Sequence, residues 1–118
     1  SCGTNVLSGA GTFTLSAGGT LGIGATAGIV DAPAASGNIQ TSTRAFNTGA
    51  NYIYNGSAAQ VTGSGLPGTV NNLTINNAAG VALSQTVTVN GALALVAGIL
   101  DAGANTVILS STASAILS

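Results

Sequence analysis

The sequence predicts an all-β fold, wound as a parallel β-solenoid (β-helix). Three observations lead to this fold class: short apolar segments that alternate with Thr, Ser and Asn, a six-residue spacing between apolar positions, and a near-absence of charge. No window combines a 3.6-residue apolar stripe with good helix formers, because Gly and Thr interrupt nearly every candidate. A β-sandwich is the alternative fold, since it also uses short strands and frequent turns.

Seven segments have the alternation and the Val, Ile, Leu and Thr content that favour β-strands. In chain order they are residues 12–15, 20–23, 52–54, 73–75, 86–89, 92–95 and 106–109. The Asn-Gly pairs at 55–56 and 90–91 follow two of these segments. Such pairs suit turns in which the glycine has a positive φ.

The spacing of the apolar residues predicts how the strands are connected. One series recurs every six residues, and a second series runs two residues behind it. The two series are the predicted core columns: Ile75, Val81, Val87, Leu93 and Ile99, then Leu83, Val89 and Leu95. A six-residue side of a β-solenoid places two side chains inward before the chain turns a corner.

With three such sides, one coil takes roughly 18 to 22 residues and the chain makes about five or six coils. Right-handed winding is favoured. The six-residue step loosens between residues 32 and 68, where we expect irregular corners. The 118 residues fit one domain, so we interpret 1–118 as a single β-solenoid unit, one repeat or subunit of a longer stack.

Only Asp31, Arg44 and Asp101 carry a full charge, and charged residues make up 3 % of the chain. A net charge of -1 gives no attraction to phosphates, which excludes nucleic acid as a partner. No apolar run reaches the roughly 18 residues that a membrane helix needs, so we expect no membrane insertion. A charge on stacked repeats would face a like charge in the next coil, so we expect the three charges at corners.

The two ends of the chain lack the charged or Pro-containing caps that free-standing solenoids use. The sequence therefore predicts that both ends are covered by another solenoid. The main expected partner is a copy of the same chain, either a separate subunit or a tandem repeat. The candidate end-stacking residues are Cys2, Ile116 and Leu117.

The composition supplies few of the residues that enzymes use for acid–base catalysis. The chain has no His, Lys or Glu, and its two aspartates lie 70 residues apart, so we expect no catalytic residues, no metal site and no cofactor. Tyr52 and Tyr54 share one face of a predicted strand. If Ile53 belongs to the core, both rings project outward, where they could contact another subunit or a ligand. Packing against a neighbouring coil and inward burial are the other readings.

Four runs of the sequence resemble a known class of protein. They are Tyr-Ile-Tyr-Asn-Gly-Ser from residue 52, Gln-Val-Thr-Gly-Ser-Gly-Leu-Pro from 60, Thr-Val-Asn-Asn-Leu-Thr-Ile-Asn-Asn from 69, and Val-Thr-Val-Asn-Gly-Ala-Leu-Ala-Leu from 87. The chain is similar to the Gly/Asn/Thr-rich repeat regions of very large bacterial cell-surface proteins, often exported by the type IX secretion pathway. The resemblance implies an extracellular β-solenoid segment with a structural or adhesive role and without catalytic residues.

The leading hypothesis is a structural subunit or repeat of an extracellular bacterial filament or stalk, assembled by end-to-end stacking of uncapped units. One alternative is an adhesive module that binds surface glycans through Tyr52 and Tyr54. A functional amyloid is another; it would stack identical residues in register between chains. All three readings place the protein outside the cell or on its surface.

Overall fold

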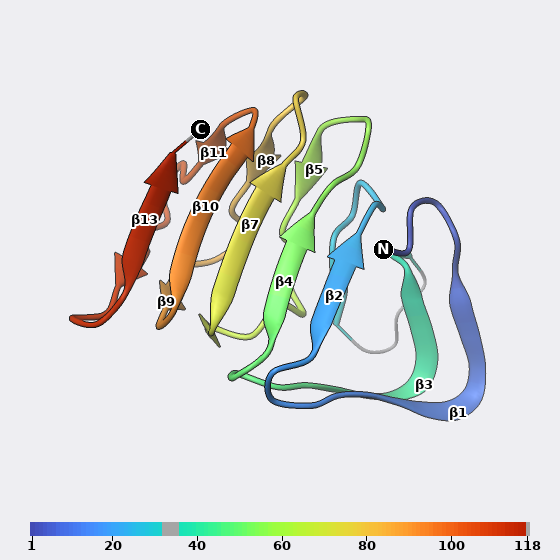
Figure 1. Ribbon diagram of the computed structural model, residues 1–118. Helices are drawn as coiled ribbons and strands as arrows, with labels where there is room; N and C mark the ends of the chain where they lie inside the picture. Colours follow the sequence, from blue (N-terminus) through green and yellow to red (C-terminus); the bar gives the residue numbers. More distant parts are fainter. Residues whose placement is uncertain (32–35, 118) are drawn as a thin grey trace.

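The computed structural model describes residues 1–31 and 36–117 and shows an all-β protein. The described part of the chain forms thirteen strands and no helix, with principal extents of 38 × 27 × 25 Å (Figure 1). The strands are β1 (Leu7–Leu15), β2 (Thr20–Ile23), β3 (Ile39–Phe46), β4 (Asn51–Tyr54), β5 (Gln60–Val61), β6 (Thr69–Val70), β7 (Asn72–Asn76), β8 (Val81–Ala82), β9 (Val87–Val89), β10 (Ala92–Ala97), β11 (Leu100–Asp101), β12 (Val107–Leu109) and β13 (Ser114–Leu117).

All seven predicted strand segments coincide with strands or overlap them. The strands that the sequence did not predict are β3, β13 and the two-residue strands β5, β6, β8 and β11. Strand β3 lies within the region where irregular corners were expected. Residues 32–35 of that region lie outside the described residues.

Every strand pairing is parallel. The strands form a five-stranded sheet in the order β13-β10-β7-β4-β2, two three-stranded sheets in the orders β11-β8-β5 and β12-β9-β6, and a two-stranded sheet of β1 and β3. Purely parallel pairing argues against the β-sandwich alternative, whose sheets are antiparallel.

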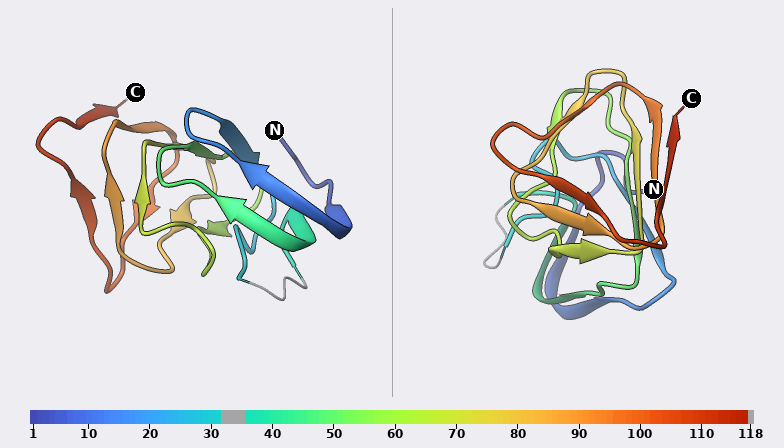
Figure 2. Two further views of the ribbon diagram at one scale, coloured as in Figure 1. Left: turned by 90° about the horizontal axis from the view of Figure 1, so that it is seen from below. Right: turned by 90° about the vertical axis from the view of Figure 1, so that its left-hand side faces the viewer.

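From β4 onward the chain visits the three larger sheets in a fixed rotation. Strands β4, β7, β10 and β13 belong to the five-stranded sheet, and each is followed by one strand of the β5 sheet and one of the β6 sheet until the chain reaches β13. Each return adds a strand beside the previous one, so Tyr52 pairs with Leu73 and Leu73 with Leu93. Viewed from the β13 end, the strands of successive turns superpose (Figure 2).

The core fills the space between these sheets. In the five-stranded sheet, Leu21, Tyr52, Leu73 and Leu93 are register partners, and all four are buried. Of the predicted core columns, Ile75, Val81, Leu83, Val87, Val89 and Leu93 are buried, and Leu95 is half-buried against them.

Ile99 is the exception: its side chain is 69 % exposed, so its assignment to a core column is wrong. Leu100, not Ile99, pairs with the buried Val81. The strand register of β10 shifts between Leu95 and Ala97, and Gly98 then adopts a φ of 78°. The register shift adds one residue to β10, but the corner after Ala97 is two residues shorter than the corner after Asn76. Leu100 therefore comes five residues after Leu95, whereas Val81 comes six after Ile75.

The turn prediction for the two Asn-Gly pairs is also wrong, because neither Gly56 nor Gly91 has a positive φ. Close packing against the strand about 20 residues earlier in the chain explains the glycine at 91 instead. A Cβ there would collide with the side-chain oxygen of Asn72, one turn earlier in the chain.

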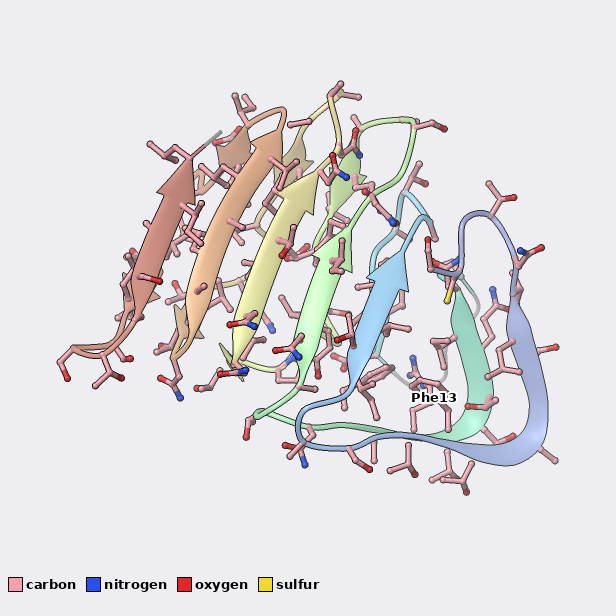
Figure 3. All side chains as sticks on the ribbon, viewed as in Figure 1. Phe13 is labelled. Carbon is pink, nitrogen blue, oxygen red and sulfur yellow. The ribbon has the colours of Figure 1, made fainter. Side chains whose placement is uncertain are left out.

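Strands β1 and β3 form a separate arm at the N-terminal end (Figure 1). Phe13 on β1 lies beside Phe46 on β3, with ring centroids 5.7 Å apart (Figure 3). Strand β4 pairs with β7, but the preceding strand β3 does not pair with β6. The β12-β9-β6 sheet therefore ends at β6, and no strand pairing joins β3 to β6 or to the loop before it.

Candidate functional site

The structure buries the two tyrosines that were the candidate outward contacts. Tyr52 and Tyr54 are both 0 % exposed, whereas Ile53 between them is only half-buried. The outward projection, which depended on Ile53 belonging to the core, is therefore wrong, and inward burial, one of the other readings, is what the structure shows. Tyr52 lies between the inward side chains of its register partners Leu21 and Leu73, so the rings occupy the columns that aliphatic residues fill in other turns.

Both hydroxyls have backbone partners inside the molecule. The hydroxyl of Tyr52 donates to the carbonyl oxygen of Asn47 at 2.8 Å, and that of Tyr54 to the carbonyl oxygen of Thr62 at 2.7 Å. Burial raises the pKa of Tyr52 to about 12. Burial, together with the charge that Tyr52 would carry, raises the pKa of Tyr54 well above its usual value. These rings are core elements with satisfied hydroxyls, and they offer no surface to a ligand.

The end of the molecule formed by β11, β12 and β13 is exposed, and we call it the open end. Each of these strands is the edge strand of its sheet, with one neighbour only among the described residues. The open end faces the viewer in the right-hand view of Figure 2. Edge strands of this kind present unpaired backbone N–H and C=O groups.

Side chains at the open end continue the core columns but are not covered. Leu109 pairs with Val89 and is 41 % exposed, whereas Val89 is fully buried. Leu117 pairs with Leu95 and is 74 % exposed. Leu109 and Leu117 thus occupy positions whose register partners lie in or against the core, but they themselves are open to solvent.

The candidate end-stacking residues lie at both ends of the molecule. Leu117 and Ile116 are on β13 at the open end. Because side chains alternate along a strand, Leu117 faces inward and Ile116, 54 % exposed, lies on the outer face. Cys2 is a free, half-buried thiol at the opposite end, where its backbone N–H donates to Gly22 in β2.

The N-terminal end differs from the expectation of a bare end, since the first residues lie over the edge of β2. The side-chain amide of Asn38 donates to the carbonyl oxygens of Gly3 and Asn5 at 2.9 and 2.7 Å and holds this segment in place. A Cβ at Gly24 would collide with the backbone of Gly3. At this end residues 1–5 therefore cover the edge of β2, whereas β1 is an edge strand with mostly exposed side chains.

The three charged residues occupy different settings. Asp31 and Asp101 are exposed, and Asp101 ends β11. Arg44 is half-buried in the middle of β3, so its predicted position at a corner is wrong. Arg44 is fixed there because its Nη1 donates to the carbonyl oxygens of Val30 and Ile39.

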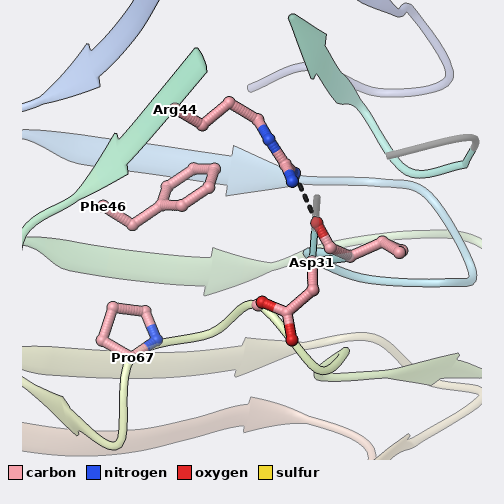
Figure 4. Close-up of a pocket in the computed structure, with 6 residues that line it drawn as sticks. Asp31, Arg44, Phe46 and Pro67 are labelled. Atoms are coloured by element: carbon pink, nitrogen blue, oxygen red, sulfur yellow. Dashed lines mark hydrogen bonds between the residues drawn. The ribbon is translucent and has the colours of Figure 1, made fainter. Parts of the chain in front are cut away.

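A pocket of about 360 Å³ lies between β3 and the loop before β6 (Figure 4). Its lining residues are Val30, Asp31, Arg44, Phe46, Gly65 and Pro67. The sequence reasoning did not select this site. The signal available to it was that Arg44 is the single basic residue of the chain.

The described residues contain no group of three or more His, Cys, Asp or Glu side chains placed to hold a metal ion. They also contain no helix long and apolar enough to cross a membrane. Comparison of the chain with family models, with curated proteins and with solved structures finds no match.

Proposed function

We propose that this chain is a β-solenoid segment with a structural role, part of an extracellular bacterial filament or stalk, and that another coil packs on its open end. The observation that carries the proposal is the contrast between equivalent positions in successive turns. Val89 is fully buried, and its partner Leu109 at the open end is 41 % exposed.

The winding of the chain supports the solenoid. Three parallel sheets visited in rotation, with register partners about one turn apart, are the arrangement that a solenoid of three-sided coils would produce. The five strands of the largest sheet would then correspond to five coils. The low charge favours stacking, because near-identical coils bring like positions within about 4.8 Å of each other.

Covering the open end would be energetically favourable. Each large aliphatic side chain that moves from water into a core contributes about 1.5–3 kcal/mol. Leu100, Val107, Leu109 and Leu117 are available for such burial. The unpaired N–H and C=O groups of β11, β12 and β13 would gain ladder partners at the same time.

The residues over the β2 edge give the proposed stack a direction. The covering coil would approach β11, β12 and β13, whereas the β2 edge already has residues 1–5 over it. The coil can come from a further stretch of the same polypeptide or from a second chain, and the mass of the native polypeptide distinguishes these two sources.

Charge placed at the open end tests the proposal. Leu109→Glu with Leu117→Glu puts two carboxylates at inward positions, and burying an unpaired charge costs several kcal/mol. We expect the association measured by sedimentation velocity to weaken by about a hundredfold or more.

The matched control is Ile108→Glu with Ile116→Glu, which adds the same charge to the same strands on their outer faces. We expect this variant to associate almost as the unmodified protein does. Equal association of the two double variants would contradict the proposal, because it would show that the inward positions stay in water.

A further inference from the structure

The pocket beside Arg44 lies where the β12-β9-β6 sheet ends at β6. Strand β3 supplies Arg44 and Phe46 on one side, and the loop before β6 supplies Gly65 and Pro67 on the other. Val30 and Asp31 close a third side. Because β3 and β6 do not pair, side chains rather than backbone ladders line the space between them.

The residues in this pocket are those that the rest of the chain nearly lacks. The pocket contains the single basic residue of the protein, one of its two acidic residues and one of its two phenylalanines. One of its two prolines, Pro67, completes the set. In a chain with 3 % charged residues, this concentration of chemically distinctive side chains marks the site.

Arg44 is held rigidly and still has donors to offer. Its Nη1 is bound to two backbone carbonyl oxygens, and its guanidinium carbon lies 5.8 Å from the centre of the Phe46 ring. The buried Nε has no hydrogen-bond partner in the described part of the chain. A guanidinium carries five N–H donors, so a ligand can be bound by those that the carbonyl oxygens do not use.

Asp31 supplies acceptors to the same space. Its backbone N–H donates to the hydroxyl of Ser64 at 3.2 Å, which anchors the residue, and its side chain is exposed. Figure 4 shows its carboxylate pointing away from the guanidinium of Arg44. A ligand in the pocket therefore meets donors on one side and acceptors on another.

From this arrangement we infer that the pocket beside Arg44 binds a neutral saccharide, one pyranose ring in size. Hydroxyls on one side of the ring can accept from Arg44 and hydroxyls on another can donate to Asp31, and the C–H face of the ring can pack on Phe46 and Pro67. The opposite charges disfavour other ligands, because an anion would face Asp31 and a cation would face Arg44. An apolar ligand would leave both charged groups desolvated without partners. The volume of about 360 Å³ lies at the lower end of the range of about 300–1,000 Å³ for small-molecule sites.

The inference is independent of the proposed stacking, since the pocket lies on the β3 side and not at the open end. It differs from the glycan contact predicted from the sequence, which used Tyr52 and Tyr54. Those rings are buried in the core, whereas Phe46 and Arg44 line a pocket.

Saturation-transfer NMR with four neutral probes tests the inference: the methyl glycosides of glucose, galactose, mannose and N-acetylglucosamine. We expect transfer to at least one of them, and a Kd about tenfold weaker in Asp31→Asn, because a hydrogen bond to a charged carboxylate is replaced by one to a neutral amide. Asp31→Asn keeps the backbone bond to Ser64, so the fold stays intact. Asp101→Asn changes the other carboxylate of the chain and leaves the affinity unchanged.

Three results would overturn the inference. One is the absence of transfer to all four glycosides. Another is an affinity that Asp31→Asn leaves unchanged. The third is binding of the glucuronate anion alone, made tighter by Asp31→Asn, which would identify a carboxylate site around Arg44 instead.

Discussion

Tyr52 and Tyr54 show how single residues adapt this thin core. They stand in columns otherwise filled by Leu and Ile, and each hydroxyl donates to a backbone carbonyl oxygen. The alternation of apolar and polar residues predicts only that two faces exist. In the segment around Ile53 both faces carry large side chains, so the pattern does not decide which face is inside. The register with Leu21 and Leu73 decides it, and these partners lie 31 and 21 positions from Tyr52 in the sequence.

The buried tyrosines make the stability sensitive to alkali. Above pH 10, the usual tyrosine pKa, the unfolded chain loses protons that the folded chain keeps, since burial raises both pKa values in the fold. The tyrosines therefore leave the free energy of unfolding unchanged below pH 10. As the pH rises toward 12 they lower it by up to about 1.4 kcal/mol per pH unit for each tyrosine.

Urea unfolding at several pH values measures this slope. Tyr54→Phe keeps the ring and removes the ionisable group, so it should reduce the slope, and Tyr52→Phe with Tyr54→Phe should reduce it further. At neutral pH each change costs about 0.5–1.5 kcal/mol for the lost hydrogen bond. An alkaline slope that stays the same in the double variant would show that the hydroxyls reach solvent in the fold.

Arg44 illustrates the limit of sequence reasoning at this scale. Low overall charge suggested that every charge lies at a corner, yet Arg44 is in the middle of β3. Its position depends on the carbonyl oxygen of Val30, which lies in a loop 14 residues earlier in the chain. No local pattern contains that contact.

At the scale of elements, strands with two inward apolar side chains could be predicted, whereas the two-residue strands and the eight-residue β3 could not. β2, β7 and β10 each hold two inward apolar side chains, which gives them a clear alternation. β5 and β11 are recognised only by their pairing with β8. Ile99 lies outside the core because the register shift in β10 and the shorter corner after it together shorten the six-residue spacing by one, which places Leu100 opposite Val81.

The edge of β13 allows a test that separates backbone pairing from side-chain packing. The N–H of Ser114 donates to Gly91, next to β10. Because parallel ladders alternate, the N–H of Ala115 points to the other side, toward the open edge. Ala115→Pro removes that outward donor and keeps the β10 ladder, since proline is tolerated on edge strands.

We expect Ala115→Pro to reduce association in sedimentation velocity and to leave the unfolding free energy of the separated chain nearly unchanged. Ile116→Pro is the matched control: it removes an N–H that points to β10, so it should destabilise the separated chain. Undiminished association of Ala115→Pro would argue against strand pairing across the open edge.

At the scale of the whole molecule, the two ends are chemically different. Neither end carries a charged cap in the sequence, which predicted two bare ends. The structure places residues 1–5 over the edge of β2. These residues form no strand and are held by Asn38, more than 30 residues further along the chain. A segment without periodicity gives no local sign of such a contact, so only the open end could be anticipated.

The low charge has a consistent physical meaning for this molecule. Turns that repeat about every 20 residues place equivalent positions side by side, as in the pairs Leu73–Leu93 and Val87–Val107. Like charges at such positions would repel, and uncharged Thr, Asn and Ser avoid that cost. Arg44 and Asp31 lie where the regular pairing stops, and Asp101 lies on an edge strand.

Amide hydrogen exchange in β13 of the assembled protein tests the central claim, that another coil pairs with the open end. The account predicts slow exchange at all four amides from Ser114 to Leu117 in the assembly. In the separated chain it predicts fast exchange at Ala115 and Leu117, whose N–H groups point to the open edge. Fast exchange at Ala115 and Leu117 in the assembly, with protection only at Ser114 and Ile116, would contradict it.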